Sequence, residues 1–147
     1  MNKAIEELKF QQLMKPTSIT ASTVLYNGAA ATTVGYLDTQ DFDEVIIELN
    51  KGTFATGAVV DFTVVNGATT DPSAATAITG ATFTQGTPSA HNAVEVMSIR
   101  CKDTLRYLWL KSSKTDVGGA AALWGATAIL AKPETIPTAA TLVVADL

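Results

Sequence analysis

The stretch that decides the fold is DEVIIELN at residues 43–50, in which every second side chain from Val45 to Leu49 is apolar. A second stretch with the same period, AVVDFTVV at residues 58–65, is followed by the turn signal Asn66-Gly67. A period of two is typical of a strand that buries one face. We therefore expect two strands here, joined to others by tight turns.

The rest of the chain continues this pattern, with short apolar runs separated by Gly, Pro, Asn and Asp. No segment has the length and helical period of a crossover helix between parallel strands. Eight or nine strands without such helices predict an all-β fold, an antiparallel β-sandwich or jelly roll. The further strands are expected at residues 20–26, 33–37, 77–84, 93–100, 105–112, 121–131 and 141–145.

The N-terminal residues 1–16 differ from this pattern. Apolar side chains among Lys and Glu, with Asn2 before them and Pro16 after them, suit a short amphipathic helix over residues 3–14. Leu8 and Phe10 also alternate as in a strand, so an extended arm that orders against a partner is the alternative. The predicted organisation is an N-terminal arm or short helix at 1–16 and a single β-sandwich domain at 17–147.

Composition excludes two classes of protein. The 147 residues carry 10 Lys and Arg against 14 Asp and Glu, and only Arg100 and Arg106 supply guanidinium groups, so a nucleic-acid partner is not expected. An apolar fraction of 47% with a net charge of −4 excludes a disordered chain. A charged fraction of only 16% favours a chain that packs against neighbours.

Catalytic and metal-binding residues are scarce. His91 is the single histidine, in a loop, and Cys101 is the single cysteine, expected to be a buried and inert thiol. Together they cannot supply an ordinary zinc site, and no phosphate-binding glycine motif is present. We expect neither enzymatic activity nor a cofactor or metal.

Four carboxylates lie close together in the sequence, at Asp38, Asp41, Asp43 and Glu44. Aspartates at turns commonly accept hydrogen bonds from backbone NH groups, which is the structural interpretation. Calcium binding is the alternative, although the spacing and glycine of an EF-hand are missing.

The sequence predicts no membrane association. The N-terminus lacks the apolar stretch of a secretory signal. The longest apolar run, residues 117–131, is shorter than a membrane helix and contains three glycines. We expect synthesis in a cytoplasm.

Two predicted strands are apolar on both faces. In LRYLWL at residues 105–110 the aromatic side chains alternate with leucines, and residues 121–131 behave in the same way. Each strand therefore needs cover on its second face, from a loop of the same chain or from another subunit; we expect a subunit. The candidate contact residues are Phe10, Leu13, Met14, Tyr107, Trp109, Leu123 and Trp124.

Residues 35–45, GYLDTQDFDEV, and residues 105–110, LRYLWL, resemble two short motifs of the small head decoration (cement) proteins of tailed bacteriophages. In that family a D-T-x-G-[F/Y]-D segment opens a central strand and an R-Y segment opens a late one. Asp41 stands where glycine is usual, and since Asp tolerates positive φ the turn is expected to persist. Trp109 stands where a second arginine is common.

The resemblance implies a β-sandwich or jelly roll that self-associates as a dimer or trimer on the outer face of an icosahedral capsid. The expected function is decoration and stabilisation of the capsid by bridging subunits of the major capsid protein. Two alternatives remain: another virion component such as a tail or fibre-associated module, and a carbohydrate-binding jelly roll in which Trp109 or Trp124 stacks on sugars.

Overall fold

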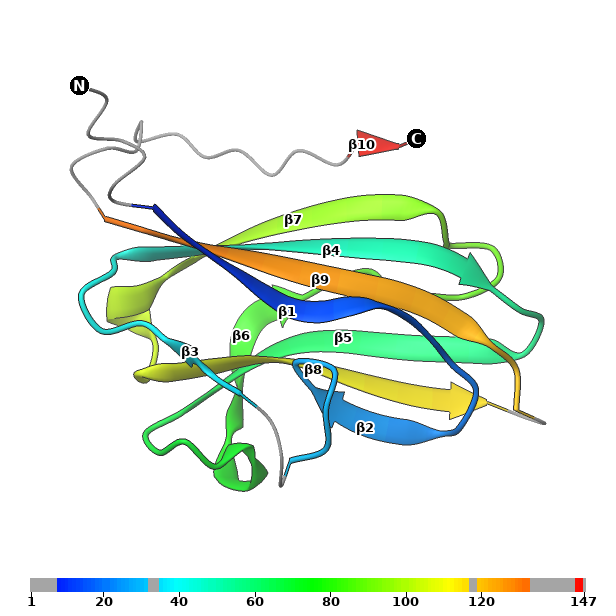
Figure 1. The fold of residues 1–147 in the computed structure, drawn as a ribbon, viewed down its shortest axis with the longest axis horizontal. Coiled ribbons are helices and arrows are strands. Elements are labelled where there is room, and N and C mark those ends of the chain that lie inside the picture. The colour runs from blue at the N-terminus through cyan, green and yellow to red at the C-terminus, as the bar shows by residue number, and fades with distance from the viewer. Residues whose placement is uncertain (1–7, 32–34, 117–118, 133–144, 147) are drawn as a thin grey trace.

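The computed structural model describes residues 8–31, 35–116, 119–132 and 145–146 (Figure 1). These residues form ten β-strands and two short 3₁₀ helices, η1 (Pro72–Ala74) and η2 (Cys101–Asp103). Within these ranges no helix has the length and apolar character needed to cross a membrane.

The strands form two antiparallel sheets that face each other (Figure 1). Sheet A has the order β1 (Leu8–Ile19), β9 (Ala122–Ala131), β4 (Glu44–Phe54), β7 (Ala93–Arg100) and β10 (Ala145–Asp146). Sheet B has the order β2 (Thr23–Tyr26), β8 (Tyr107–Asp116), β5 (Ala58–Gly67) and β6 (Thr76–Thr82), and β3 (Leu37–Asp38) also pairs with β8.

The strand order identifies the sandwich as a jelly roll. Strands from the two ends of the chain pair with each other, β1 with β9 and β2 with β8. Strands from the middle pair in the same nested manner, β4 with β7 and β5 with β6. This double-sheet arrangement of eight main strands is that of a jelly roll. The predicted fold class, an all-β antiparallel sandwich, is confirmed.

The helix expected over residues 3–14 is wrong for residues 8–14, which lie in β1; residues 1–7 are outside the described ranges. β1 forms one edge of sheet A, and the boundary expected at residue 16 falls within it. Burial outweighs the local helical pattern here, because Leu13 and Met14 are only 5% and 6% exposed against the core. Pro16 passes over Gly125, where a Cβ would lie 3.0 Å from the proline ring.

Trp124 occupies the centre of the core between the sheets. It comes from β9 in sheet A and contacts the ring of Phe62 from sheet B edge to face, with 5.7 Å between ring centroids. Phe54 also stacks against Trp124, with 6.5 Å between ring centroids. Gly86 fits against this cluster only because it lacks a Cβ, which would lie 2.6 Å from the Phe54 ring.

A buried ion pair lies on the inner face of sheet A. Lys51 continues the inward row of Val45, Ile47 and Leu49, and its Nζ lies 2.5 Å from Glu95 Oε1 on β7. The second carboxylate oxygen of Glu95 accepts a hydrogen bond from the Thr84 backbone NH at 3.0 Å. The pair thus ties β4 and β7 to the segment that leaves β6, and its charges are compensated as burial requires.

Trp109 corrects the expectation that a subunit covers the second face of β8. It lies opposite Val65 on the outer side of sheet B, yet none of its surface is exposed. The cover belongs to the same chain, because the side chain is fully buried within one protomer and its ring lies against Gly67 at the end of β5. A single protomer therefore buries this tryptophan without a second subunit.

Core packing predicts a large difference between two phenylalanines. Phe62→Ala removes a fully buried ring that touches Trp124, and should lower the free energy of unfolding by about 3–5 kcal/mol. Phe10→Ala, at a side chain that is 64% exposed, should change it by less than about 0.5 kcal/mol. Urea unfolding followed by tryptophan fluorescence measures both, and equal losses would contradict the packing described.

Candidate interaction surface

The junction of β3 and β8 brings together two segments that are far apart in the sequence. Asp38 pairs in register with Tyr107, and its carboxylate accepts two hydrogen bonds from Arg106, from Nε at 2.9 Å and from Nη2 at 2.7 Å. The Gln40 backbone NH donates to the same carboxylate at 3.0 Å. Two parallel hydrogen bonds hold the guanidinium in one orientation at the surface.

Aromatic and apolar side chains surround this ion pair. The Arg106 guanidinium lies over the ring of Tyr107 at 5.1 Å, and that ring meets Tyr36 edge to face at 4.9 Å. Tyr36 is 40% exposed, and Leu105, which precedes Arg106, is 46% exposed. We call these five residues the Tyr36–Arg106 patch: Tyr36, Asp38, Leu105, Arg106 and Tyr107.

Hydrogen bonds to the backbone hold the two segments of the patch together. Both the backbone NH and the hydroxyl of Thr39 donate to the Arg106 carbonyl, at 3.0 and 2.8 Å. The buried Asn66 side chain accepts a hydrogen bond from the Leu105 backbone NH through Oδ1, at 2.9 Å. Asp41 has a φ of 71°, so the turn after β3 has the left-handed conformation that was expected there and that Asp tolerates.

The positive charge of Arg106 and the negative charge of Asp38 compensate each other within the patch. The hydrogen bonds from Arg106 hold the pKa of the Asp38 carboxyl below its ordinary value of 3.8, against a smaller opposing effect of burial. The same hydrogen bonds raise the pKa of Arg106 further above its ordinary value. The patch therefore presents little net charge, with aromatic rings, a leucine and an oriented guanidinium.

Tyr, Arg and Trp are the residue types that most often dominate binding energy at protein interfaces. A patch with two tyrosines, an arginine and a leucine, fixed by backbone hydrogen bonds, suits recognition of another protein. Its side chains are preorganised, so less conformational entropy is lost on association.

The structure separates the predicted contact residues into two groups. Leu13, Met14, Trp109 and Trp124 are 6% exposed or less within the protomer, so a partner does not reach them in this structure. Their burial also excludes stacking of Trp109 or Trp124 on a sugar. Phe10 is largely exposed, and Tyr107 and Leu123 are partly exposed; Leu123 covers Gly52.

Phe10 belongs to a second apolar feature, on the outer face of sheet A. In register it pairs with Ile129 on β9, which pairs with Ile46 on β4. Ile46 and Ile129 are partly exposed, and they point away from the core because their neighbours Val45 and Leu130 point into it. We call this row the Phe10 strip: Phe10, Ile129 and Ile46.

The residues considered for chemistry are far apart. His91 precedes β7 and Cys101 follows it, so about 25 Å of strand separates them and they form no Cys–His pair. Burial raises the pKa of the Cys101 thiol to about 11, and the charges of Asp43 and Glu44 act in the same direction. Of the four neighbouring carboxylates, Asp38 binds a backbone NH as the structural interpretation predicted.

Part of this patch is predictable from the sequence. Tyr107 is a predicted contact residue and Arg106 belongs to the R-Y motif, whereas Asp38 is predicted as a turn residue or a calcium ligand, and Tyr36 and Leu105 are not predicted as contact residues. The signal available was the pair of segments that carry the resemblance, since these are the segments that β3 and β8 bring together.

Comparison with known proteins shows similarity at the level of structure. No protein-family model matches the chain, and no curated protein does. The structure is similar to VP2 of infectious bursal disease virus in a subviral particle, with a TM-score of 0.51, 12% identity and 85% of this chain covered. For VP2 of the Gx strain the TM-score is 0.51, with 13% identity over 84% of this chain. For VP2 of the Gt strain the TM-score is 0.50, with 14% identity over 88% of this chain.

At this level of identity the likeness shows the fold alone. The chain spans about one third of the length of these VP2 chains, between 32% and 34%. The class defined by fold and comparison is thus an antiparallel jelly roll of the kind that VP2 contains.

The Asp38–Arg106 pair predicts a specific pH dependence. Because the folded-state pKa of Asp38 is lowered, its contribution to stability is present above pH 4 and is lost as the pH falls through that lowered value. Asp38→Asn should be slightly less stable than the wild type at pH 7, and the difference should vanish at low pH. Urea midpoints between pH 7 and pH 2 test this, with Asp41→Asn as control. A pH-independent difference would contradict the assignment.

The state of Cys101 predicts its reactivity. With a pKa of about 11, roughly 0.1% of the thiol is ionised at pH 8, and it is buried as well. A thiol reagent such as DTNB should not label the native protein during the time in which it labels the urea-unfolded protein completely. Rapid stoichiometric labelling of the native protein would show that the thiol is exposed.

Proposed function

We propose that this protein is a structural component of a virion, which decorates the outer surface of an icosahedral phage capsid and stabilises it by bridging capsid subunits. The observation that carries the proposal is the Tyr36–Arg106 patch. The two segments that resemble the phage decoration proteins converge in it, and it exposes residue types typical of protein interfaces. A jelly-roll fold shared with VP2 of a subviral particle is consistent with this role.

Bridging requires two separate contact surfaces on one protomer. The Phe10 strip lies on the outer face of sheet A. Tyr107 points to the outer side of sheet B, because it lies two residues from Trp109 on that face. The two surfaces therefore belong to opposite sheets, and one protomer can contact two neighbours at once.

The proposal assigns a partner to each surface. The Tyr36–Arg106 patch contacts the major capsid protein. The Phe10 strip, with the partly exposed Leu123 on the same face of β9, mediates self-association as a dimer or trimer. The protein acts without catalysis, is made in the host cytoplasm and resides on the outer capsid surface. Many modest contacts, repeated over the copies on a particle, supply the stabilisation.

Capsid binding tests the first assignment. Leu105→Ala combined with Tyr107→Ala should weaken binding to capsids assembled without this protein by at least about tenfold, measured by cosedimentation. Thr82→Ala, at an exposed position on β6, serves as the matched control and should bind like the wild type. Wild-type affinity of the double variant would remove the patch from the mechanism, and absence of any wild-type binding would refute the proposed function.

Self-association is measured independently of capsids. Phe10→Ala should shift the mass of the purified protein toward that of a monomer in sedimentation equilibrium, since the strip loses its most exposed apolar side chain. An unchanged oligomer would exclude the strip from the interface.

A further inference from the structure

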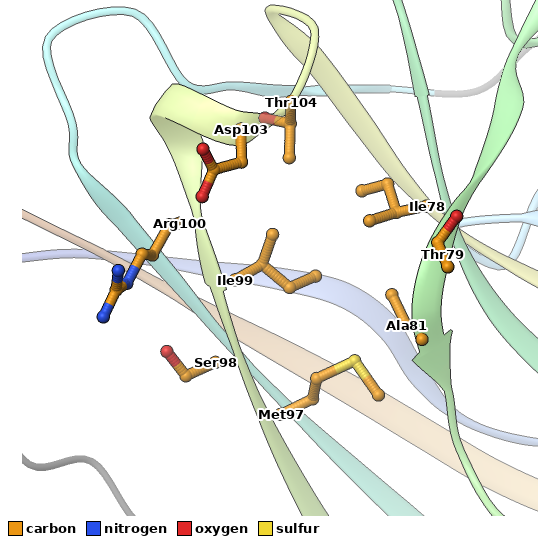
Figure 2. A pocket seen from close by; sticks show the side chains of 10 residues that line it. Ile78, Thr79, Ala81, Met97, Ser98, Ile99, Arg100, Asp103 and Thr104 are labelled. Atoms are coloured by element: carbon orange, nitrogen blue, oxygen red, sulfur yellow. The ribbon is translucent and has the colours of Figure 1, made fainter.

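The chain has two arginines, and the structure holds them differently. Arg100, at the end of β7, is exposed and points away from the groove that Ile78 and Met97 line between β6 and β7 (Figure 2). Arg106 is held along one edge by Asp38 and over one face by Tyr107. Arg106 therefore presents its guanidinium to a partner in a defined orientation.

The guanidinium of Arg106 has donors left for a further acceptor. It carries five N–H donors, and the Asp38 carboxylate accepts one from Nε and one from Nη2. Among the described residues no second acceptor binds Arg106, and 48% of its side chain is exposed. The edge between Nη1 and Nη2 has the geometry that binds a carboxylate through two parallel hydrogen bonds. One guanidinium can thus bind Asp38 and a carboxylate of a partner at the same time.

Lys9 places a second positive charge beside the patch. Lys9 and Gln11 lie on the same side of β1, because they are two residues apart in a strand, and the Gln11 side chain donates a hydrogen bond to the Tyr36 carbonyl at 3.2 Å. The pKa of Asp38 is lowered mainly by the hydrogen bonds from Arg106, and the charge of Lys9 lowers it further. The patch together with Lys9 is therefore positive, on a protein with a net charge of −4.

Apolar surface next to Arg106 strengthens an ion pair formed there. Leu105 is 46% exposed and Tyr36 is 40% exposed. A partner that covers these two side chains excludes water from the guanidinium. An ion pair is stronger where water is excluded, so the apolar border and the charge act together.

The charge balance selects the class of ligand. The single excess positive charge of Arg106, Lys9 and Asp38 matches one carboxylate better than a phosphate group, which carries about two negative charges. A nucleic acid would need a larger cluster of cations. The matching group is therefore an acidic side chain of a protein.

We propose that the Tyr36–Arg106 patch binds a carboxylate of the major capsid protein, which the Nη1–Nη2 edge of Arg106 holds and the charge of Lys9 attracts. This inference rests on the proposed function, because it names the group that the capsid presents to the patch. Asp38 is then a positioning residue, which orients the guanidinium that the capsid carboxylate binds.

Binding to capsids assembled without this protein, measured by cosedimentation, tests the role of the guanidinium. Arg106→Gln should weaken binding at least about tenfold relative to the wild type, whereas the matched control Arg100→Gln should bind like the wild type. Asp38→Asn should weaken binding much less than Arg106→Gln, because it keeps the guanidinium and removes a charge that repels the capsid carboxylate. Equal losses for Asp38→Asn and Arg106→Gln would show that the pair only holds the patch together, and would overturn the inference.

The role of Lys9 is tested by the salt dependence of the same binding. Lys9→Gln should weaken binding about threefold at low ionic strength and by less at high ionic strength, since salt screens the attraction. Lys15→Gln changes another exposed lysine of β1, about 20 Å further along the strand, and should have no such effect. Equal effects of the two variants would exclude Lys9 from recognition.

Neutralising the capsid carboxylates tests the partner directly. Capsids treated with a carbodiimide and glycinamide, which convert exposed carboxylates to neutral amides, should bind the wild-type protein at least about tenfold more weakly than untreated capsids. This loss and the loss from Arg106→Gln should not add, because both remove the same ion pair. Additive losses, or unchanged binding to the treated capsids, would overturn this inference and leave the proposed function standing. Absence of wild-type binding to untreated capsids would refute the proposed function itself.

Discussion

Packing of Trp124 between the two sheets is the interaction on which the rest of the structure depends. Its ring, with Phe54 and Phe62, joins β9 and β4 of sheet A to β5 of sheet B. Burial of apolar surface is the dominant favourable term in folding, and a sandwich without helices obtains it only by pressing its sheets together. Once the sheets are fixed in this way, β3 meets β8 and the Tyr36–Arg106 patch is assembled at the surface.

The protomer therefore covers its aromatic residues more completely than its sequence indicates. Trp109 is fully buried within the protomer, with its ring against Gly67, although it points away from the core. The surfaces left for partners are smaller and more specific: an oriented arginine between tyrosines, and an apolar row centred on Phe10. The proposed function uses both outer faces of this small jelly roll, so that one protomer contacts two neighbours.

Alternation of apolar and polar residues along the chain made several strands predictable. The stretch at residues 93–100 was predicted with the bounds of β7, and those at 43–50 and 58–65 are the cores of β4 and β5. The N-terminal strand was not predictable in this way, because the pattern over residues 8–14 fits both a helix and a strand. Pairing of β1 with β9 decides between them. The Asp38–Arg106 pair joins residues 68 positions apart, a separation at which a single sequence carries no pairing signal.

The sequence by itself determined the all-β class and the positions of most strands, because these follow from composition and from a period of two. Only the tertiary structure decided which strands are neighbours, which of the two apolar faces the chain covers, and which side chains remain outside. Those outcomes depend on contacts between segments that are distant in the chain, and such contacts exist only in the folded protein, where the two sheets enclose Trp124.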